Sequence, residues 1–144
     1  MIPAWRIARR PYADLSGEGA RRWGGRWNRP GRPVIYLADH PALALLEVRV
    51  HLDLPFDLLP DDYVLMHVAL PDGPLAEVTE LPPDPQIAGA TWLDQGEAVL
   101  LRVPSVLVPG AWNLLLNPTH PAGETARILA RTPLRFDPRL WGTS

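Results

Sequence analysis

The feature that most constrains the fold is a series of short apolar runs separated by stretches rich in proline and glycine. Residues 34–38 contain Val, Ile and Tyr and follow a proline, which suits a buried strand better than a helix. Residues 63–70 alternate in a way that predicts a central strand, buried on at least one face. Further strands are expected at residues 5–8, 75–78, 99–103, 106–108, 114–116 and 128–136.

One helix is predicted between residues 34–38 and 63–70. Asp39 or His40 can cap it, Pro41 fits its first turn, and residues 42–50 are strong helix formers. The next proline, Pro55, closes this helical stretch.

Length and composition indicate one domain, residues 1–144, with enough apolar material for a core: 47% of the 144 residues are hydrophobic. Cysteine is absent, which excludes disulfides, thiolate metal sites and cysteine nucleophiles. Lysine is also absent, which excludes Schiff-base chemistry. No leader pattern or membrane-length apolar run occurs, so we expect a soluble, cytoplasmic protein without a membrane partner.

Charge is distributed unevenly along the chain. Arginines crowd residues 6–32, where only Asp14 and Glu18 oppose them, whereas acids dominate residues 39–97. This polarity can attract an anionic ligand to one end and offer a second surface to a partner. The net charge of -2 is unlike that of a duplex-binding protein, which is usually basic overall.

A long irregular segment, residues 9–33, leads to the strand at residues 34–38 and is called the arm below. Loops of such length inside compact domains tend to be functional or mobile. Within it, Gly24 and Gly25 free the backbone to turn sharply, and Arg26 supplies a planar, permanently charged fork. This pattern is typical of a loop that grips phosphate. A surface turn with a solvated arginine is the alternative.

Glu47 is the only charged residue in residues 42–48 of the predicted helix, among apolar neighbours that must face a core. Burying a carboxylate without a partner is costly, so we expect it at the edge of a polar cavity. A structural ion pair with Arg49 or with an arginine of the arm is the alternative.

The remaining candidates are ambiguous in isolation. Tyr36 points away from the face of its strand neighbours and can fill a core or support a ligand. Arg6 can be a solvated strand residue, and Ser105 can satisfy a turn through its hydroxyl. No metal site is predicted, because no metal-ligand spacing occurs among His40, His51, His67 and His120. No serine-hydrolase elbow or phosphate-binding P-loop is present either.

A different class of function stays open at this point. The arm mixes basic and aromatic residues of the kind that hold single-stranded nucleic acid. They are Arg21, Arg22, Trp23, Arg26, Trp27 and Arg29.

Several motifs, taken in order and spacing, resemble the RES-domain family, whose name comes from its Arg, Glu and Ser. The resemblance covers nearly the whole chain. It is carried by residues 5–7, 17–20, 24–28, 34–38, 44–47, 101–105 and 113–121, and continues to residues 136–140.

The resemblance implies an α+β fold with a split, mixed β-sheet around a central NAD cleft, similar to the ADP-ribosyltransferase toxins. It implies the toxin of a bacterial type II toxin–antitoxin system, with an Xre-type helix-turn-helix antitoxin that blocks the cleft, and a homodimer within that complex as one arrangement. The implied activity is cleavage of the nicotinamide–ribose bond of NAD by hydrolysis or phosphorolysis. Some relatives instead ADP-ribosylate a protein. NAD is then a substrate, and no prosthetic group, metal or direct nucleic-acid contact is expected.

The family's active-site positions fall on Arg6, Arg26, Tyr36, Glu47 and Ser105. By this resemblance all five bind NAD, and Glu47, Arg26 and Tyr36 are catalytic. Glu47 stabilises the charge that develops on the ribose. The two arginines hold the pyrophosphate and ribose, Tyr36 stacks on or orients nicotinamide, and Ser105 bonds near the ring or ribose.

Overall fold

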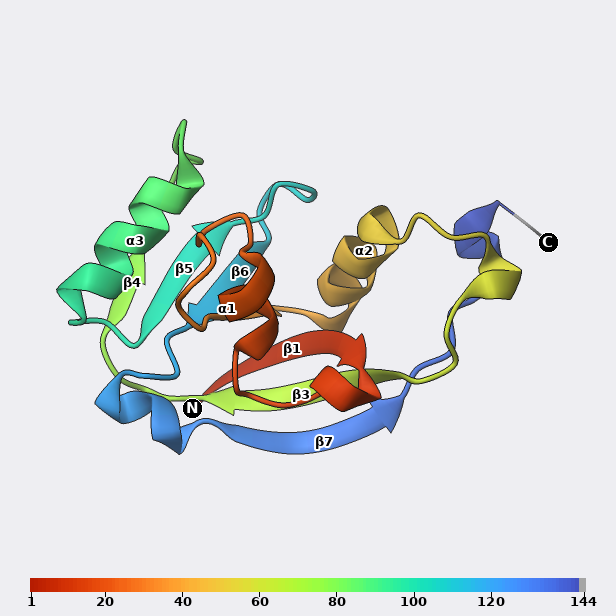
Figure 1. Ribbon diagram of the computed structural model, residues 1–144, viewed down its shortest axis with the longest axis horizontal. Helices are drawn as coiled ribbons and strands as arrows, with labels where there is room; N and C mark the ends of the chain where they lie inside the picture. The colour runs from red at the N-terminus through yellow and green to blue at the C-terminus, as the bar shows by residue number, and fades with distance from the viewer. Residues whose placement is uncertain (143–144) are drawn as a thin grey trace.

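The computed structural model describes residues 1–142, whose strands form one seven-stranded sheet in the order β4-β5-β6-β2-β1-β3-β7 (Figure 1). Neighbouring strands are antiparallel, except that β4 and β5 are parallel, so the sheet is mixed. Residues 143–144 of the expected domain lie outside the described residues. The strands are β1 (Ile2–Arg9), β2 (Ile35–Ala38), β3 (Tyr63–Leu70), β4 (Leu75–Glu77), β5 (Leu100–Pro104), β6 (Trp112–Leu116) and β7 (Arg127–Pro133).

In residues 1–142, three α-helices and four short 3-10 helices accompany the sheet. None of the helices in residues 1–142 is long and apolar enough to span a membrane. They are α1 (Glu18–Trp23), α2 (Pro41–His51) and α3 (Pro85–Gln95), with η1 (Arg10–Tyr12), η2 (Phe56–Leu58), η3 (Pro121–Thr125) and η4 (Pro138–Trp141).

The sheet is split between β1 and β2. These two strands are paired only at Trp5 and Ala38, whereas β1 pairs with β3 along its whole length. Figure 1 shows β1, β3 and β7 together, with β5 and β6 running in a different direction above them. The expected α+β fold with a split, mixed sheet is therefore confirmed.

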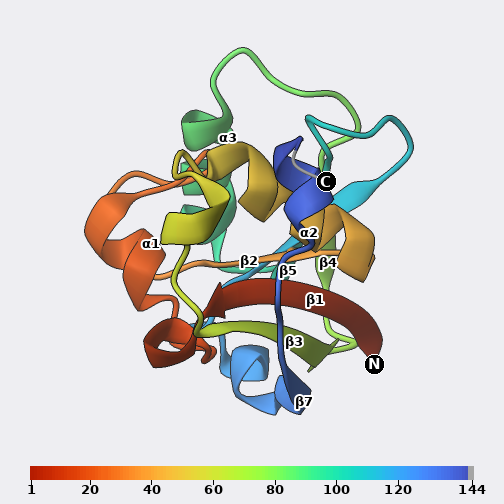
Figure 2. The ribbon, with the colours of Figure 1, turned by 90° about the vertical axis from the view of Figure 1, so that its right-hand side faces the viewer.

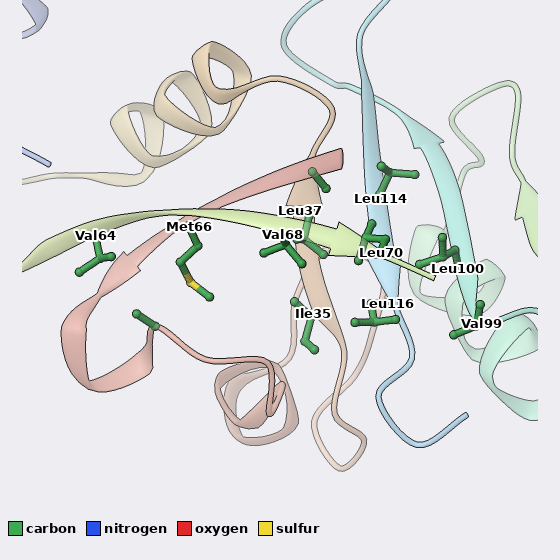
Figure 3. Close-up of a cluster of buried hydrophobic side chains, with 12 residues drawn as sticks. Ile35, Leu37, Val64, Met66, Val68, Leu70, Val99, Leu100, Leu114 and Leu116 are labelled. Carbon is green, nitrogen blue, oxygen red and sulfur yellow. The ribbon is translucent and has the colours of Figure 1, made fainter. Parts of the chain in front are cut away.

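The main core lies between the two parts of the sheet. Ile35 and Leu37 of β2 pack with Met66 and Val68 of β3 and with Leu114 of β6 (Figure 3). The buried side chains come from strands on both sides of the split, so this core fixes how the two parts face each other. Hydrophobic burial of this kind is the main stabilising term in folding.

Two further clusters attach helices to the sheet. Trp92 and Leu93 of α3 pack with Trp27 of the arm and Leu115 of β6. Leu43 and Ala44 of α2 pack with Ala38, and Trp5 and Ile7 of β1 lie against them. α2 and the arm are thus both fixed beside the split.

The predicted helix is confirmed as α2. The His40 side chain accepts a hydrogen bond from the Ala42 amide, and Pro41 occupies the first turn, where its missing amide proton is not needed. The strands predicted at residues 5–8, 34–38, 63–70, 75–78, 99–103, 114–116 and 128–136 are also present with shifted ends. β3 is interior, between β1 and β7, but next to an edge of the sheet.

The strand predicted at residues 106–108 is wrong. The segment forms a turn between β5 and β6, in which the Ser105 hydroxyl accepts hydrogen bonds from the amides of Leu107 and Val108. Local hydrogen bonding around Ser105 and the adjacent Pro109 and Gly110 outweighs the strand preference of the valines.

Candidate functional site

A cavity of about 1050 Å³ lies where β1 and β2 separate. Figure 2 shows α2 above β1 and α1 to one side of it. The cavity is lined by residues of β1, β2 and α2, by the arm, by the start of α3 and by the turn after β5. Arg6, Arg26, Tyr36 and Glu47 all line it, so residues far apart in the sequence meet at one site.

The loop that carries Arg26 is a tight turn closed on itself. The Gly25 amide donates to the Asn28 carbonyl at 2.8 Å, and the two residues form an antiparallel bridge. The Asn28 side chain is buried and donates to the carbonyl of Ala20 at 3.0 Å, which ties the turn to α1. The backbone around Arg26 is therefore fixed by hydrogen bonds.

Tyr36 supports this turn from β2. Its hydroxyl accepts a hydrogen bond from the Trp27 amide at 3.0 Å and donates one to Asn28 Oδ1 at 2.6 Å. A Cβ atom on Gly25 would lie 2.7 Å from the hydroxyl oxygen, so the glycine permits this close approach. Burial raises the pKa of Tyr36 to about 12, which keeps the phenol protonated near neutral pH. The hydroxyl is committed to the loop, and the ring remains to contact a ligand.

Arg26 itself is exposed at the cavity, and within residues 1–142 its guanidinium makes no hydrogen bond or ion pair. Its charge acts on the site nonetheless, because it lowers the pKa of both Glu47 and Tyr36. The five N–H donors of this side chain are available to a carboxylate or phosphate.

Glu47 lies on α2, and its carboxylate is held by Asn113 of β6. The Asn113 amide nitrogen donates to Glu47 Oε1 at 2.7 Å and to the Leu37 carbonyl at 3.2 Å. Burial is the largest effect on the pKa of Glu47 and raises it; nearby Asp39 raises it further, while Asn113 and Arg26 oppose the shift.

The ion pair with Arg49 suggested by the sequence is wrong. Arg49 donates instead to the Leu140 carbonyl at 2.8 Å, and its guanidinium lies 4.2 Å from the centre of the Trp141 ring. Within residues 1–142 no arginine lies in ion-pair contact with Glu47. Its carboxylate faces the cavity with a neutral amide as its partner, as a group that acts on a ligand would.

Arg6 lies on β1, and its Nη1 donates to the Tyr12 carbonyl at 2.8 Å. Burial lowers the pKa of Arg6 and the nearby Asp14 charge opposes this. Arg6 also lines the cavity, together with Arg26. Two arginines at one cavity suit a ligand with more than one negative charge.

Ser105 ends up beside the cavity and not in its wall. Its neighbours Pro104 and Val106 line the cavity, while its hydroxyl accepts from the amides of Leu107 at 3.0 Å and Val108 at 3.1 Å. The hydroxyl proton remains available for donation. Contact between Ser105 and NAD stays a prediction.

Two contributors to the site were not foreseen, Asn113 and Gln86. Asn113 stands near the start of an apolar strand, and a polar amide in that position was the one sequence feature that could have indicated its role. Gln86 lies at the start of α3, a helix that was not predicted from the sequence. Within the described residues no group of three or more His, Cys, Asp or Glu is placed to hold a metal.

The aromatic and basic residues of the arm do not form one free surface. Trp27 is only 3% exposed, Arg21 pairs with Glu18, and Arg32 pairs with Asp94 at 2.5 Å. Trp23, which is 81% exposed, is the part of the set open to stacking. This arrangement does not favour a nucleic-acid-binding module.

Comparison with known proteins defines the class. The RES domain matches residues 3–137. The chain is 42% identical over 132 residues to Toxin Res of Pseudomonas putida, which covers 86% of this chain and 90% of that protein. It is 38% identical to the Prs ADP-ribosylating toxin of Sphingobium sp., with 94% of each protein covered. The protein is therefore of a class of small α+β proteins that includes bacterial toxins.

The chain belongs to the RES-domain family, as the sequence motifs predict. Its fold also resembles the crystal structure of the Mycobacterium tuberculosis MbcT-MbcA toxin-antitoxin complex, with a TM-score of 0.73, 24% identity, and coverage of 97% of this chain and 86% of that one. A stretch of 35 residues, 24% of this chain and 19% of that protein, is 63% identical to the NAD(+) phosphorylase MbcT of the same organism.

Proposed function

We propose that this protein is the toxin of a bacterial toxin–antitoxin pair and that it depletes NAD by cleaving the bond between nicotinamide and ribose. Support comes from relatives named as toxins and from the NAD(+) phosphorylase MbcT. The observation that carries the proposal is Glu47: a half-buried carboxylate, held by an amide and not by an arginine, in a cavity that also presents Arg6 and Arg26.

The chemistry of the bond explains why such a carboxylate matters. When the C1′–N bond breaks, its electron pair leaves with nicotinamide, which becomes neutral, and positive charge develops on the ribose. An acceptor oxygen then forms the new bond to C1′. A fixed carboxylate stabilises the developing charge more than it stabilises the substrate, and that difference is catalysis.

Each remaining site residue has a role in the proposal. Arg26 and Arg6 bind the diphosphate and the adjoining ribose, because guanidinium groups match phosphate oxygens geometrically. The Tyr36 ring contacts nicotinamide, while its hydroxyl stays on the Arg26 loop. Ser105 donates its free proton near the nicotinamide or ribose. NAD is a substrate in this scheme and not a resident cofactor.

A second activity is transfer of ADP-ribose to a protein. The name of the Sphingobium relative, which is aligned over 94% of this chain, favours it. Both activities break the same bond and need the same carboxylate. They differ only in the acceptor, which is water or phosphate in one and a protein side chain in the other.

The proposed partner is an antitoxin, by analogy with MbcA in the complex of the structural neighbour. We assign it to the Xre type with a helix-turn-helix, on the family resemblance alone. A homodimer within the complex is part of the same proposal. The proposed substrate is a cytoplasmic metabolite, which assigns the protein to the cytoplasm.

Product analysis tests the proposal and separates its branches. Pure protein without antitoxin is incubated with NAD in phosphate-free buffer, in phosphate buffer and with a bacterial protein extract, and the products are separated and weighed by mass spectrometry. Free nicotinamide is expected in at least one of the three incubations. Its partner product is ADP-ribose, a phosphorylated ADP-ribose or a modified protein. Folded protein that releases no nicotinamide in any incubation overturns the enzyme assignment. Strong salt-dependent binding to RNA or DNA would then favour the nucleic-acid alternative.

A further inference from the structure

We propose that Gln86 is a positioning residue that clamps both ends of the Arg26 loop and so sets how tightly the site holds its anionic substrate. The inference rests on the proposed function, because it takes the substrate to be NAD, held through its diphosphate by Arg26. It gives a role to a residue of α3 that lines the cavity.

The contacts of Gln86 span the turn that carries Arg26. Its amide nitrogen donates to the carbonyl of Gly25 at 3.2 Å and to the carbonyl of Asn28 at 3.4 Å. These two residues flank Arg26 and Trp27 and bridge to each other. On the other side, the amide oxygen of Gln86 accepts from Arg29 Nε at 3.5 Å. One side-chain amide therefore contacts the first residue of the turn, its last residue and the arginine that follows it.

The position of Gln86 is itself fixed by the start of α3. The Asp84 carboxylate caps the helix by accepting from the amides of Gln86 at 3.1 Å and Ile87 at 3.2 Å. One turn later, the helix backbone lies directly against the loop: a Cβ atom on Gly89 would lie 1.7 Å from the Trp27 carbonyl oxygen. The α3 helix is thus a rigid support in direct contact with the loop.

This support matters because the Arg26 side chain has no partner of its own within residues 1–142. Its placement depends on the backbone, which Tyr36 holds through the Trp27 amide and Gln86 holds through the two carbonyls. A loop ordered before binding avoids the entropy cost of ordering on binding. Loss of the clamp should weaken substrate binding and leave the chemical step at Glu47 intact.

The test compares Gln86→Ala with Gln95→Ala. Gln95 ends the same helix, is exposed and makes no side-chain hydrogen bond among the described residues, so the second variant controls for the loss of a glutamine from α3. For Gln86→Ala we expect the KM for NAD to rise about tenfold with kcat within about twofold of wild type, as for the loss of binding that acts equally on substrate and transition state. Gln86→Glu keeps the side-chain length but loses the donor, so its KM should rise at least as much.

Limited trypsin digestion reads the loop without NAD. Within residues 24–33, Arg26 is the arginine that is not followed by proline, so trypsin cuts this segment after Arg26. Cleavage there should be faster in Gln86→Ala and Gln86→Glu than in wild type or Gln95→Ala. This readout stands even where wild type consumes no NAD, which is the failure of the proposed function and not of the clamp.

The inference is overturned by a KM for NAD that stays at the wild-type value in both Gln86 variants, or by trypsin cleavage after Arg26 at the wild-type rate. A lower melting temperature with reduced kcat and unchanged KM also overturns it, since that pattern belongs to a residue that only stabilises the fold. If Gln86→Ala does not fold, Gln86→Glu decides.

Discussion

Glu47 is a partly buried carboxylate whose charged form lowers the stability of the fold. Because burial raises its pKa, the folded protein binds the Glu47 proton more tightly than the unfolded chain does. The stability contribution of Glu47 therefore falls as the pH rises from the ordinary glutamate pKa, about 4.3, through the raised folded value. Above that raised value, the ionised carboxylate is present at a cost in stability.

We therefore predict that Glu47→Gln melts at or above the wild-type temperature at pH 8, and that any gain shrinks toward pH 4. Glutamine keeps the shape and can still accept from Asn113. Thermal unfolding of both proteins across this pH range measures the effect. A variant that melts well below wild type at pH 8 would show that the carboxylate stabilises the fold and that its surroundings have been misread.

Asn113 tunes the same carboxylate. Its hydrogen bond lowers the pKa of Glu47 against the larger effect of burial, so Asn113→Ala should raise that pKa further. Turnover that needs ionised Glu47 falls as the pH drops through its pKa, and the acid limb of the profile should therefore move to higher pH in the variant. The pH dependence of kcat/KM for NAD measures the shift. An acid limb at the wild-type pH would mean that Asn113 does not control the ionisation of Glu47.

Arg26 is predicted to hold NAD through geometry as well as charge. Arg26→Lys should weaken NAD binding by about 1–3 kcal/mol, because a lysine ammonium cannot reproduce the two parallel hydrogen bonds of a guanidinium. Titration calorimetry in a Glu47→Gln background, where NAD is expected to be consumed far more slowly, gives the affinity. Arg22→Lys is the matched control, since Arg22 is exposed on α1 and outside the cavity wall. Equal affinity for both variants would leave Arg26 without a gripping role.

Sequence patterns located the residues of the site better than the contacts that hold them. Glu47 stands out as a lone charge on an apolar helix and Arg26 as an arginine after two glycines, whereas Arg6 and Tyr36 were assigned through the family resemblance. The partners could not be read in this way. Asn113 is 66 residues from Glu47, and Gln86 is 61 from Gly25, so only the folded sheet brings them together.

Among the elements, α3 carries a clear sequence signal that the neighbouring composition hid. Asp84 caps the helix, Pro85 occupies its first turn, and Gly96 ends it in the left-handed conformation with φ 64°. The proline-rich, acidic stretch at residues 71–85 favours a loop, and no element was predicted for residues 86–95. Gly89 is needed because the Trp27 carbonyl occupies the space of a side chain.

The 3-10 helix η4 fastens the end of the described chain to the region after α2. Trp141 Nε1 donates to the Leu54 carbonyl at 3.0 Å. Its ring packs edge to face with the rings of Phe56 and Phe136, with 5.7 Å and 5.5 Å between the ring centres. Arg49, two residues after Glu47, lies over the same ring. This cluster stabilises the carboxyl-terminal end of α2.

We predict that Trp141→Ala lowers the free energy of unfolding by about 2 kcal/mol, less than for a fully buried tryptophan because Trp141 is partly exposed. Trp23→Ala is the control, as Trp23 is 81% exposed and makes no ring contact among the described residues. Urea denaturation of both variants measures the difference. Equal stabilities would show that the aromatic cluster adds nothing to the fold.

For the molecule as a whole, the split in the sheet creates the cavity. β1 and β2 meet only at Trp5 and Ala38, and the residues on the diverging side of that pair, Arg6 and Tyr36 among them, line the space between the strands. Local patterns placed most of these strands but not their order, because strand order depends on contacts distant in sequence. The split sheet was foreseen through the family resemblance alone.

The charge asymmetry of the chain also acquires a structural meaning. The basic arm folds along one side of the cavity, and although Arg21 and Arg32 pair with acids, Arg26 is left free of such a partner within residues 1–142. In the proposed function, an anionic substrate meets this unpaired guanidinium in the cavity that Glu47 also lines.

The most direct test is the rate of nicotinamide release from NAD by wild type and by Glu47→Gln, measured side by side on folded, antitoxin-free protein. Wild type should release nicotinamide continuously, and the variant, equally folded, should be slower by about a hundredfold or more, as for removal of a preorganised charge from a transition state. Release at the wild-type rate by Glu47→Gln would contradict the assignment of Glu47 as the catalytic carboxylate, and no release by wild type would contradict the NAD-cleaving function itself.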